Sequence, residues 1–225
     1  MFALPRDFDR PHANDHAYRH EAMLYSGDDG FVDGVASFVR AGVAAGEPML
    51  VVVQAHKIDM LQAALGDDAA GVQFADMAAV GQNPARIIPA WREFVADHAG
   101  EGRLRGVGEP VYVERSPHEL AECHLHEALL NVALADAPLS LLCPYDTDTL
   151  GPRDIEKAID NHPFLHVDGR TSENGRFGTP VEWFGGDLPE PAVETDAVDF
   201  DLEGLFLVRR LVDDRAGAFG LEPER

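Results

Sequence analysis

Lysine is almost absent from this sequence. Only two of the 18 basic residues, Lys57 and Lys157, are lysines, and 40 acidic residues bring the formal net charge to −22. Nucleic acids and anionic membrane surfaces attract clusters of positive charge, and no Lys/Arg run is visible. The charge balance therefore predicts neither a nucleic-acid partner nor a membrane partner.

Cysteines and long apolar runs are also scarce. Cys123 and Cys143 are the only two cysteines, too few for a secreted disulfide scaffold, which favours a reducing compartment. No apolar run approaches the roughly 20 residues that span a bilayer, and the first residues lack a signal-peptide pattern. We expect a cytoplasmic protein.

A phosphate loop is missing where it would be expected, after the first apolar run. A P-loop surrounds phosphates with backbone N–H groups and a lysine. The turn here reads Ser26-Gly27-Asp28-Asp29-Gly30-Phe31, with two carboxylates and no lysine. Acids suit a helix N-terminus but repel a triphosphate. The turn predicts no nucleotide site, and we expect Asp28 or Asp29 to cap the following helix.

Strand and helix patterns alternate five times along the chain. Residues 49–53, Met-Leu-Val-Val-Val, are apolar on both faces, as a buried parallel strand must be. The alternation predicts an α/β fold with an open, mostly parallel sheet of five or more strands and helices on both faces. Strands are predicted at 22–25, 49–53, 72–76, 104–109 and 139–143, and helices at 31–45, 56–65, 83–95, 116–135 and 152–161. Pro89 predicts a kink in the third helix or a later start.

The chain divides by composition into four parts. Residues 1–17 are polar and aperiodic and predict a flexible leader. The α/β domain spans 18–185, with an edge strand expected at 180–184. An acidic, Pro-rich linker follows at 186–200, and a helix at 201–225.

A ligand site is expected past the carboxyl ends of the strands, as is usual in open parallel sheets. Polar side chains there, together with those of a polar helix at 118–127, predict a small-molecule pocket. The expected ligand-binding residues, which would orient the ligand and hydrogen-bond to it, are His20, Tyr25, Glu109, Glu122, His126, Cys143 and Tyr145.

Metal binding and catalysis are weaker hypotheses. Glu119, Glu122, Cys123 and His126 are spaced by three and four, so they share one helix stripe. No zinc-type ligand spacing and no nucleophile elbow is present, so we predict no cofactor and no enzyme activity. Two alternatives stay open: a metal site built from Cys123, His126, Cys143 or His20, and a metal-assisted hydrolase using Glu109, Glu122 and His126.

An ordered set of motifs extends along residues 17–185. The motifs are Arg19-His20-Glu21-Ala22-Met23-Leu24-Tyr25, Gly46-Glu47-Pro48, Asn83-Pro84-Ala85-Arg86, Gly106-Val107-Gly108-Glu109-Pro110, Glu122-Cys123-His124-Leu125-His126-Glu127, Cys143-Pro144-Tyr145-Asp146 and His162-Pro163. Together they resemble MEDS, the methanogen/methylotroph DcmR sensory domain. The resemblance implies a RecA-like fold without its phosphate loop and a sensor of small hydrocarbon derivatives.

The tail at 202–225 resembles the opening helix of an anti-sigma-factor kinase-like ATPase domain. The sequence stops before the Asn-bearing helix of such domains, so we expect a fragment or a lost output module, and no kinase activity. This resemblance implies a sigma/anti-sigma system protein as a partner. An interaction module of such a system is therefore the alternative to a ligand sensor.

Overall fold

The central sheet is built around apolar strands such as β2 (Met49–Val53), in which Val51 and Val53 are fully buried. The computed structural model describes residues 18–167, 170–178, 201 and 204–220. Within them one sheet contains β1 (Arg19–Tyr25), β2, β3 (Gln73–Asp76), β4 (Leu104–Gly108), β5 (Leu139–Asp146), β6 (Phe164–Val167) and β7 (Arg170–Glu173).

The strands lie in the order β3-β2-β4-β5-β1-β6-β7. All neighbours run parallel except β6 and β7, which are antiparallel. β1 is central and pairs with β5 from Arg19↔Ser140 to Tyr25↔Asp146. The predicted α/β fold is confirmed, and the arrangement is that of an open RecA-like sheet.

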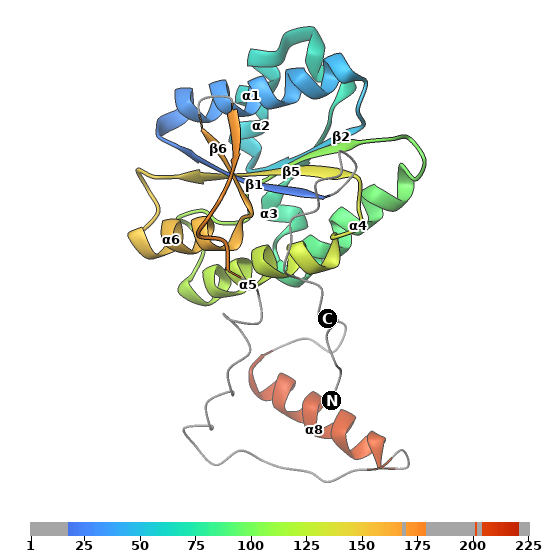
Figure 1. The fold of residues 1–225 in the computed structure, drawn as a ribbon. Coiled ribbons are helices and arrows are strands. Elements are labelled where there is room, and N and C mark those ends of the chain that lie inside the picture. Colours follow the sequence, from blue (N-terminus) through green and yellow to red (C-terminus); the bar gives the residue numbers. More distant parts are fainter. Residues whose placement is uncertain (1–17, 168–169, 179–200, 202–203, 221–225) are drawn as a thin grey trace. The chain divides into compact units, whose positions relative to one another are not determined.

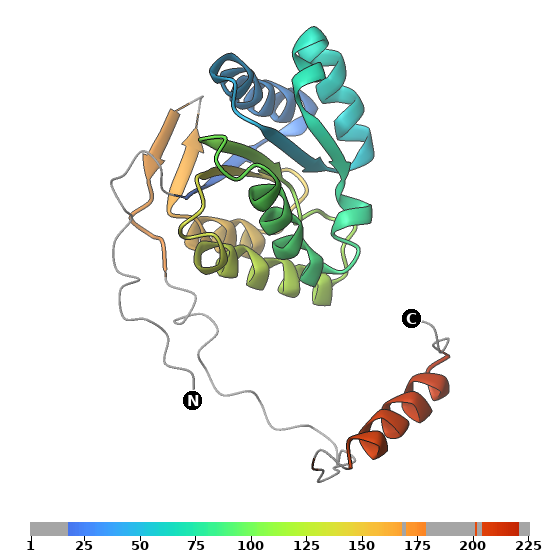
Figure 2. The ribbon, with the colours of Figure 1, turned by 90° about the vertical axis from the view of Figure 1, so that its right-hand side faces the viewer.

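Helices cover both faces of the sheet, as the amphipathic patterns predict (Figures 1 and 2). One face carries α1 (Gly27–Ala45) and α2 (Ala55–Leu65), and the other carries α4 (Ile87–Asp97), α5 (Pro117–Ala133) and α6 (Pro152–Asn161). Shorter turns of helix lie in the connections: η1 (Gly66–Gly71), α3 (Met77–Val80) and η2 (Pro84–Arg86).

Each face of the sheet has its own apolar core. On one face, Phe31 and Val35 of α1 and Leu61 of α2 belong to one buried apolar cluster. On the other face, Trp91 of α4 and Leu130 of α5 belong to the second cluster. Burial of such side chains contributes about 1.5–3 kcal/mol each relative to exposure. The two cores therefore anchor the helices on the two faces of the sheet.

Several element boundaries differ from the prediction. β5 continues through Pro144, where a turn was expected, and the pair β6–β7 was not predicted. Pro89 is the third residue of α4, in the first turn, where proline is tolerated. The predicted later start is confirmed, because η2 precedes α4. The expected edge strand at 180–184 lies outside the described residues.

The first strand–helix turn is capped differently from the expectation. Ser26 occupies the N-cap position of α1, and the helix begins at Gly27, whose φ of 68° glycine tolerates easily. Asp28 and Asp29 lie exposed in the first turn of α1. Their charges interact favourably with the helix dipole, but neither residue is the N-cap. The turn remains acidic, as its sequence indicates.

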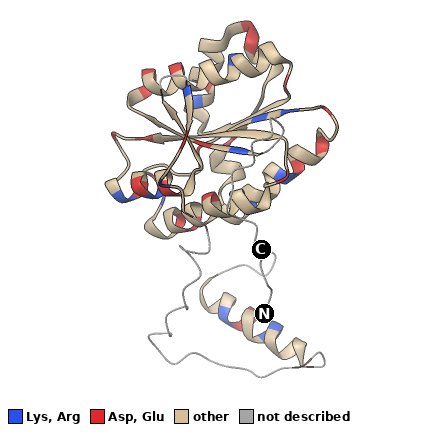
Figure 3. Cartoon of the chain, in the orientation of Figure 1, with Lys and Arg blue, Asp and Glu red and all other residues tan. Residues whose placement is uncertain are grey.

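The chain forms two separate units, residues 1–186 and 187–225. In the second unit α8 (Leu205–Ala218) is the described helix, and none of its described residues is buried. The expected leader at 1–17 and the expected linker at 186–200 both lie entirely outside the described residues. In the first unit Lys and Arg are interspersed among acidic side chains (Figure 3).

Candidate functional site

Three polar side chains meet at the carboxyl edge of the sheet. Tyr25 ends β1, Glu109 directly follows β4, and Lys57 projects from the first turn of α2. The Lys57 Nζ atom lies 2.6 Å from both Glu109 Oε1 and the Tyr25 hydroxyl oxygen. The Tyr25 hydroxyl donates to Glu109 Oε1 at 2.6 Å. We call Tyr25, Lys57 and Glu109 the strand-end triad.

The strand-end triad is buried, which makes its hydrogen bonding energetically important. Glu109 is 1% exposed, and Tyr25 and Lys57 are 7% exposed. Burial raises the pKa of Glu109, although the bonds from Lys57 and Tyr25 oppose the rise. The second carboxylate oxygen, Glu109 Oε2, is buried without a hydrogen-bond partner. Such an unsatisfied acceptor costs about 1–3 kcal/mol or more, so a hydrogen-bond donor next to this oxygen would stabilise the site.

The surroundings of the strand-end triad do not suit a phosphate. Lys57 is already paired with Glu109, and three carboxylates lie nearby: Asp28 in the first turn of α1, Asp146 at the end of β5, and Asp148 in the turn after it. Asp148 accepts a hydrogen bond of 2.7 Å from the Ser26 hydroxyl. The local charge is therefore negative or neutral, which favours an uncharged or donor-bearing molecule over an anion.

A second cluster lies between the sheet and helices α5 and α6. It contains His20 of β1, Glu127 of α5, Cys143 of β5 and His162 at the end of α6. Their ligating atoms lie within 4.8 Å of one another, and none of the four residues is more than 1% exposed. We call these four residues the buried cluster.

Burial and mutual contact set the protonation of the buried cluster. Burial alone would raise the pKa of Glu127, but His162 and His20, whose Nε2 atoms each lie 3.1 Å from Glu127 Oε2, hold it well below the ordinary value. Burial lowers the pKa of His162 to about 4, and His20 adds to the lowering. Burial raises the pKa of the Cys143 thiol, and Glu127 raises it further. These shifts favour an ionised Glu127 carboxylate beside a neutral His162 and a protonated Cys143 thiol.

Residues 19–163, more than half of the chain, match the family model described as MEDS, the MEthanogen/methylotroph, DcmR Sensory domain. The chain belongs to the MEDS family. The predicted resemblance is thus confirmed for a region that contains both the strand-end triad and the buried cluster. No curated protein matches the chain. No helix among the described residues has the length and apolar character needed to cross a membrane.

The structure of this MEDS domain separates the seven expected ligand-binding residues into three places. Tyr25 and Glu109 belong to the strand-end triad, and His20 and Cys143 belong to the buried cluster. Tyr145 is fully buried and its ring lies 5.5 Å from that of His162. The other two, Glu122 and His126, lie on α5, where Glu122 is exposed and its carbonyl oxygen is 2.7 Å from His126 Nδ1.

The four candidate metal ligands of the MEDS domain are likewise divided. His20 and Cys143 come together, but the other members of their cluster are Glu127 and His162. Cys123 is buried outside that cluster, and burial raises the pKa of its thiol to about 12. His126 is half-buried and contacts its own helix backbone.

Three residues important to these sites were missed from the sequence: Lys57, Glu127 and His162. The spacing Cys123, Glu127, Leu130 and Leu134 marks the buried stripe of α5, so that helical period could have placed Glu127 inward. His162 stands in the His162-Pro163 motif, which carries the family resemblance but gives no spatial partner.

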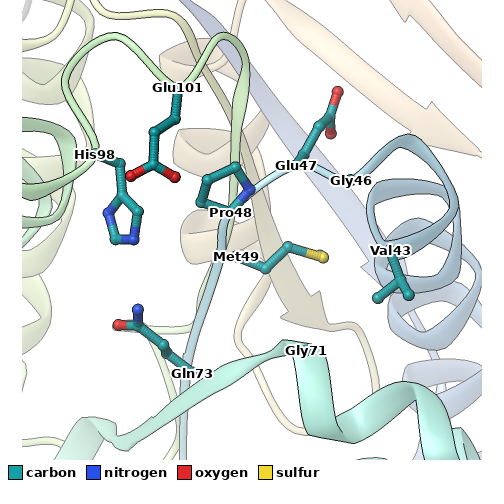
Figure 4. A pocket seen from close by; sticks show the side chains of 9 residues that line it. All are labelled: Val43, Gly46, Glu47, Pro48, Met49, Gly71, Gln73, His98 and Glu101. Carbon is teal, nitrogen blue, oxygen red and sulfur yellow. The ribbon is translucent and has the colours of Figure 1, made fainter.

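A separate hollow of about 350 Å³ lies at the opposite, amino edge of the sheet, where β2 and β3 begin (Figure 4). Glu47, one of its acids, is 2.6 Å from Arg105 Nε and is therefore already paired. His98 Nδ1 is 2.9 Å from the Phe94 carbonyl oxygen. The hollow is lined by Val43, Gly46, Glu47, Pro48, Met49, Gly71, Gln73, His98 and Glu101.

Proposed function

We propose that this MEDS domain senses a small organic molecule that binds at the carboxyl edge of the sheet and donates a hydrogen bond to Glu109. The sensory character follows from the family. The ligand class follows from the chemistry of the strand-end triad. A simple hydrocarbon derivative with a hydroxyl group carries the required donor on a small apolar body.

The observation that carries the proposal is the unpartnered oxygen Glu109 Oε2. Its companion Oε1 accepts from both Lys57 and Tyr25, so the carboxylate is held in one orientation. A hydroxyl donor would form a charge-assisted hydrogen bond, which is stronger than a bond between neutral groups. The edge where it lies is the one at which open parallel sheets bind ligands.

Signal transmission would start from the three elements that the strand-end triad joins. Tyr25 leads directly into α1 through Ser26, and Lys57 lies in the first turn of α2. A ligand that alters the Tyr25–Lys57–Glu109 contacts therefore changes the relative stability of two helices on one face of the sheet. Ligand binding can shift this equilibrium only by its differential affinity for the two arrangements.

The experiment is a thermal-shift screen of the full chain with small alcohols, diols, aldehydes and amines. A molecule that binds the folded state raises the melting temperature by mass action. Glu109→Gln keeps an acceptor for Lys57 and Tyr25 but removes the charge, so we expect it to abolish the shift. Glu114→Gln is the matched control, since Glu114 is exposed and bonded only weakly, at 3.4 Å, to Gln54.

Two results would contradict the proposal. One is the absence of a shift for wild type with every compound of the screen. The other is an equal shift in wild type and Glu109→Gln, which would place the ligand elsewhere.

An interaction module of a sigma/anti-sigma system is a second candidate, because α8 presents apolar side chains. Phe206, Leu207 and Val212 are 63%, 46% and 58% exposed. Exposed apolar residues on one helix are typical of a surface that packs on another protein chain. The tail also resembles the first helix of an anti-sigma-factor kinase-like ATPase domain.

This second candidate predicts that apolar residues of α8 hold a partner. Binding of the full chain to purified sigma and anti-sigma proteins would be compared with that of a Phe206→Ser/Val212→Ser variant by calorimetry. We expect loss of binding in the variant. Unchanged binding in the variant, or no binding by the wild type, would contradict the hypothesis that α8 binds such a partner.

A further inference from the structure

Four atoms that can serve as metal ligands lie close together in the buried cluster, which shares no residue with the strand-end triad. Glu127 Oε2 lies 3.1 Å from His20 Nε2 and 3.1 Å from His162 Nε2. Cys143 Sγ lies 3.3 Å from His20 Nε2. The two imidazole rings are 3.9 Å apart between centroids. One carboxylate, two imidazoles and one thiol therefore surround a single point.

The tautomers of both histidines direct lone pairs to that point. His20 Nδ1 is 3.1 Å from Asn131 Oδ1, and the Asn131 amide nitrogen donates to the Asn161 carbonyl oxygen at 2.9 Å. Asn131 therefore offers His20 an acceptor, and His20 Nδ1 is the donor. His162 Nδ1 donates to the Ala158 carbonyl oxygen at 2.6 Å. With each Nδ1 acting as a donor, Nε2 is the atom of each ring whose lone pair can face the cluster.

These lone pairs face a carboxylate oxygen, which is also an acceptor. His162 Nε2 is buried and makes no well-directed hydrogen bond, although Glu127 Oε2 is only 3.1 Å away. Among the described residues only histidines form ion pairs with Glu127. A buried acceptor group of this kind is unfavourable without a cation at its centre.

The dimensions fit a tetrahedral transition metal. Zinc bonds nitrogen and oxygen at about 2.1 Å and sulfur at about 2.3 Å, so the ligand atoms lie about 3.4–3.6 Å apart. Three of the six separations, two of 3.1 Å and one of 3.3 Å, are within a few tenths of an ångström of these edges, and all four atoms lie within 4.8 Å of one another. Calcium and magnesium prefer all-oxygen ligands, whereas imidazole and thiolate favour zinc.

We propose that His20, Glu127, Cys143 and His162 form a zinc site in this domain. Four protein ligands complete the tetrahedron, which is the closed coordination of a structural site rather than the open one of a catalytic site. The metal would replace the thiol proton of Cys143 and release it to solvent, because thiolate is the ligand form.

Second-sphere contacts for such a site are already present. Asn131 and the Ala158 carbonyl hold the two imidazoles in the orientation that a metal needs. The Tyr145 hydroxyl is buried beside the cluster without a partner. A thiolate or a carboxylate bound to zinc would offer this hydroxyl an acceptor. The ion would join β1, β5, α5 and the end of α6, elements far apart in the sequence.

The first test is metal analysis and cobalt substitution of the full chain. We expect about one zinc per chain, the number that one tetrahedral site binds. Bound Co²⁺ should show the strong visible bands of tetrahedral coordination and a thiolate charge-transfer band. Cys143→Ser should lose the charge-transfer band and weaken zinc affinity by more than about 100-fold, since even second-sphere changes cost about 10–100-fold.

Cys123→Ser is the matched control, because Cys123 is the other buried thiol and is not part of the cluster. It should keep the cobalt spectrum and the affinity of the wild type. A spectrum that disappears in Cys123→Ser and persists in Cys143→Ser would overturn the proposal. So would a folded wild-type chain that binds neither Zn²⁺ nor Co²⁺ at micromolar concentration.

A second measurement needs no ligand variant and stands if Cys143→Ser fails to fold. X-ray absorption of the zinc-loaded wild type should give one sulfur at about 2.3 Å and nitrogen or oxygen ligands at about 2.0–2.1 Å. Asn131→Ala, which keeps all four ligands, should weaken zinc affinity about 10–100-fold. Zinc with oxygen ligands alone, or unchanged affinity in Asn131→Ala together with no sulfur ligand, would refute the assignment.

Discussion

Lys57 Nζ and Glu109 Oε1 are 2.6 Å apart in a place where neither side chain reaches solvent freely, with side-chain exposures of 9% and 1%. A buried ion pair contributes little compared with an apolar pair, but removing one partner leaves an uncompensated charge. Helix α2 and strand β4 are therefore coupled through one contact at the carboxyl edge of the sheet.

The first prediction follows from that contact. Lys57→Met should lower the free energy of unfolding by about 3–5 kcal/mol, because Glu109 would stay buried without a cation. Urea denaturation measures the change. The double variant Lys57→Met/Glu109→Gln should regain part of it. Lys157→Met, at the exposed second lysine, is the control and should stay close to wild type; a similar loss there would contradict the interpretation.

The second prediction concerns close packing of Trp91 against β4. A Cβ atom at Gly106 would lie 2.6 Å from Trp91 Cζ3 and 3.0 Å from Leu141 Cδ1. Gly106→Ala should therefore destabilise the fold by about 1–3 kcal/mol through overpacking. Gly71→Ala, where no atom lies within 4 Å of the added Cβ, is the matched substitution. Equal melting temperatures for the two variants would show that the core yields at Gly106.

The third prediction tests the start of α5, which holds Glu127. The Ser116 hydroxyl accepts from the Glu119 backbone N–H, and the Glu119 carboxylate accepts from the Ser116 N–H at 2.9 Å. Ser116→Ala should cost about 1 kcal/mol in thermal or urea unfolding. Ser26→Ala should cost less, since Ser26 caps α1 without a side-chain bond to the helix. The reverse order of the two losses would argue against the capping box.

The fourth prediction is a pH dependence from His124. Burial lowers the pKa of His124, and Lys157 adds to the lowering, against the bond of 2.9 Å to Asp154 and the charge of Glu127, which raise it. In the unfolded chain His124 is therefore protonated near pH 6.5, whereas in the folded chain it is protonated only at lower pH. The contribution of neutral His124 to the free energy of unfolding is therefore present above about pH 6.5 and is lost as the pH falls towards the pKa of His124 in the folded chain.

Urea denaturation at about pH 7.5 and about pH 5.5 measures this dependence. His124→Gln does not titrate, so its stability should change less between the two values than that of the wild type. A variant as pH-dependent as the wild type would assign the effect to other groups.

The regular part of the fold was predictable because its signals are local. The apolar run 49–53 and the helix 152–161 were predicted with the boundaries that the structure has. β7, in contrast, reads Arg-Thr-Ser-Glu and is mostly exposed at the sheet edge, so it carries no apolar alternation. β5 could continue through Pro144 because β5 pairs with β4 only as far as Leu142.

The candidate sites were predictable only in part, since they depend on contacts between distant segments. Because Tyr25 and Glu109 both lie at carboxyl ends of parallel strands, the sequence predicts that they are close together. Lys57 lies on a helix, and the sequence does not determine the rotation of that helix about its axis. On α5 a shift of one residue separates exposed Glu122 from buried Cys123. Period alone cannot assign such a boundary when polar side chains fill both faces of the helix.

The central position of β1 has a consequence for synthesis on the ribosome. Its neighbours β5 and β6 leave the exit tunnel more than 100 residues after it does, so β1 has no partner strand while most of the domain is being made. The apolar residues of β1 therefore remain exposed in the nascent chain, which favours aggregation and chaperone binding. We expect folding of this domain to be a late event, completed only after the segment that ends with β6 has emerged.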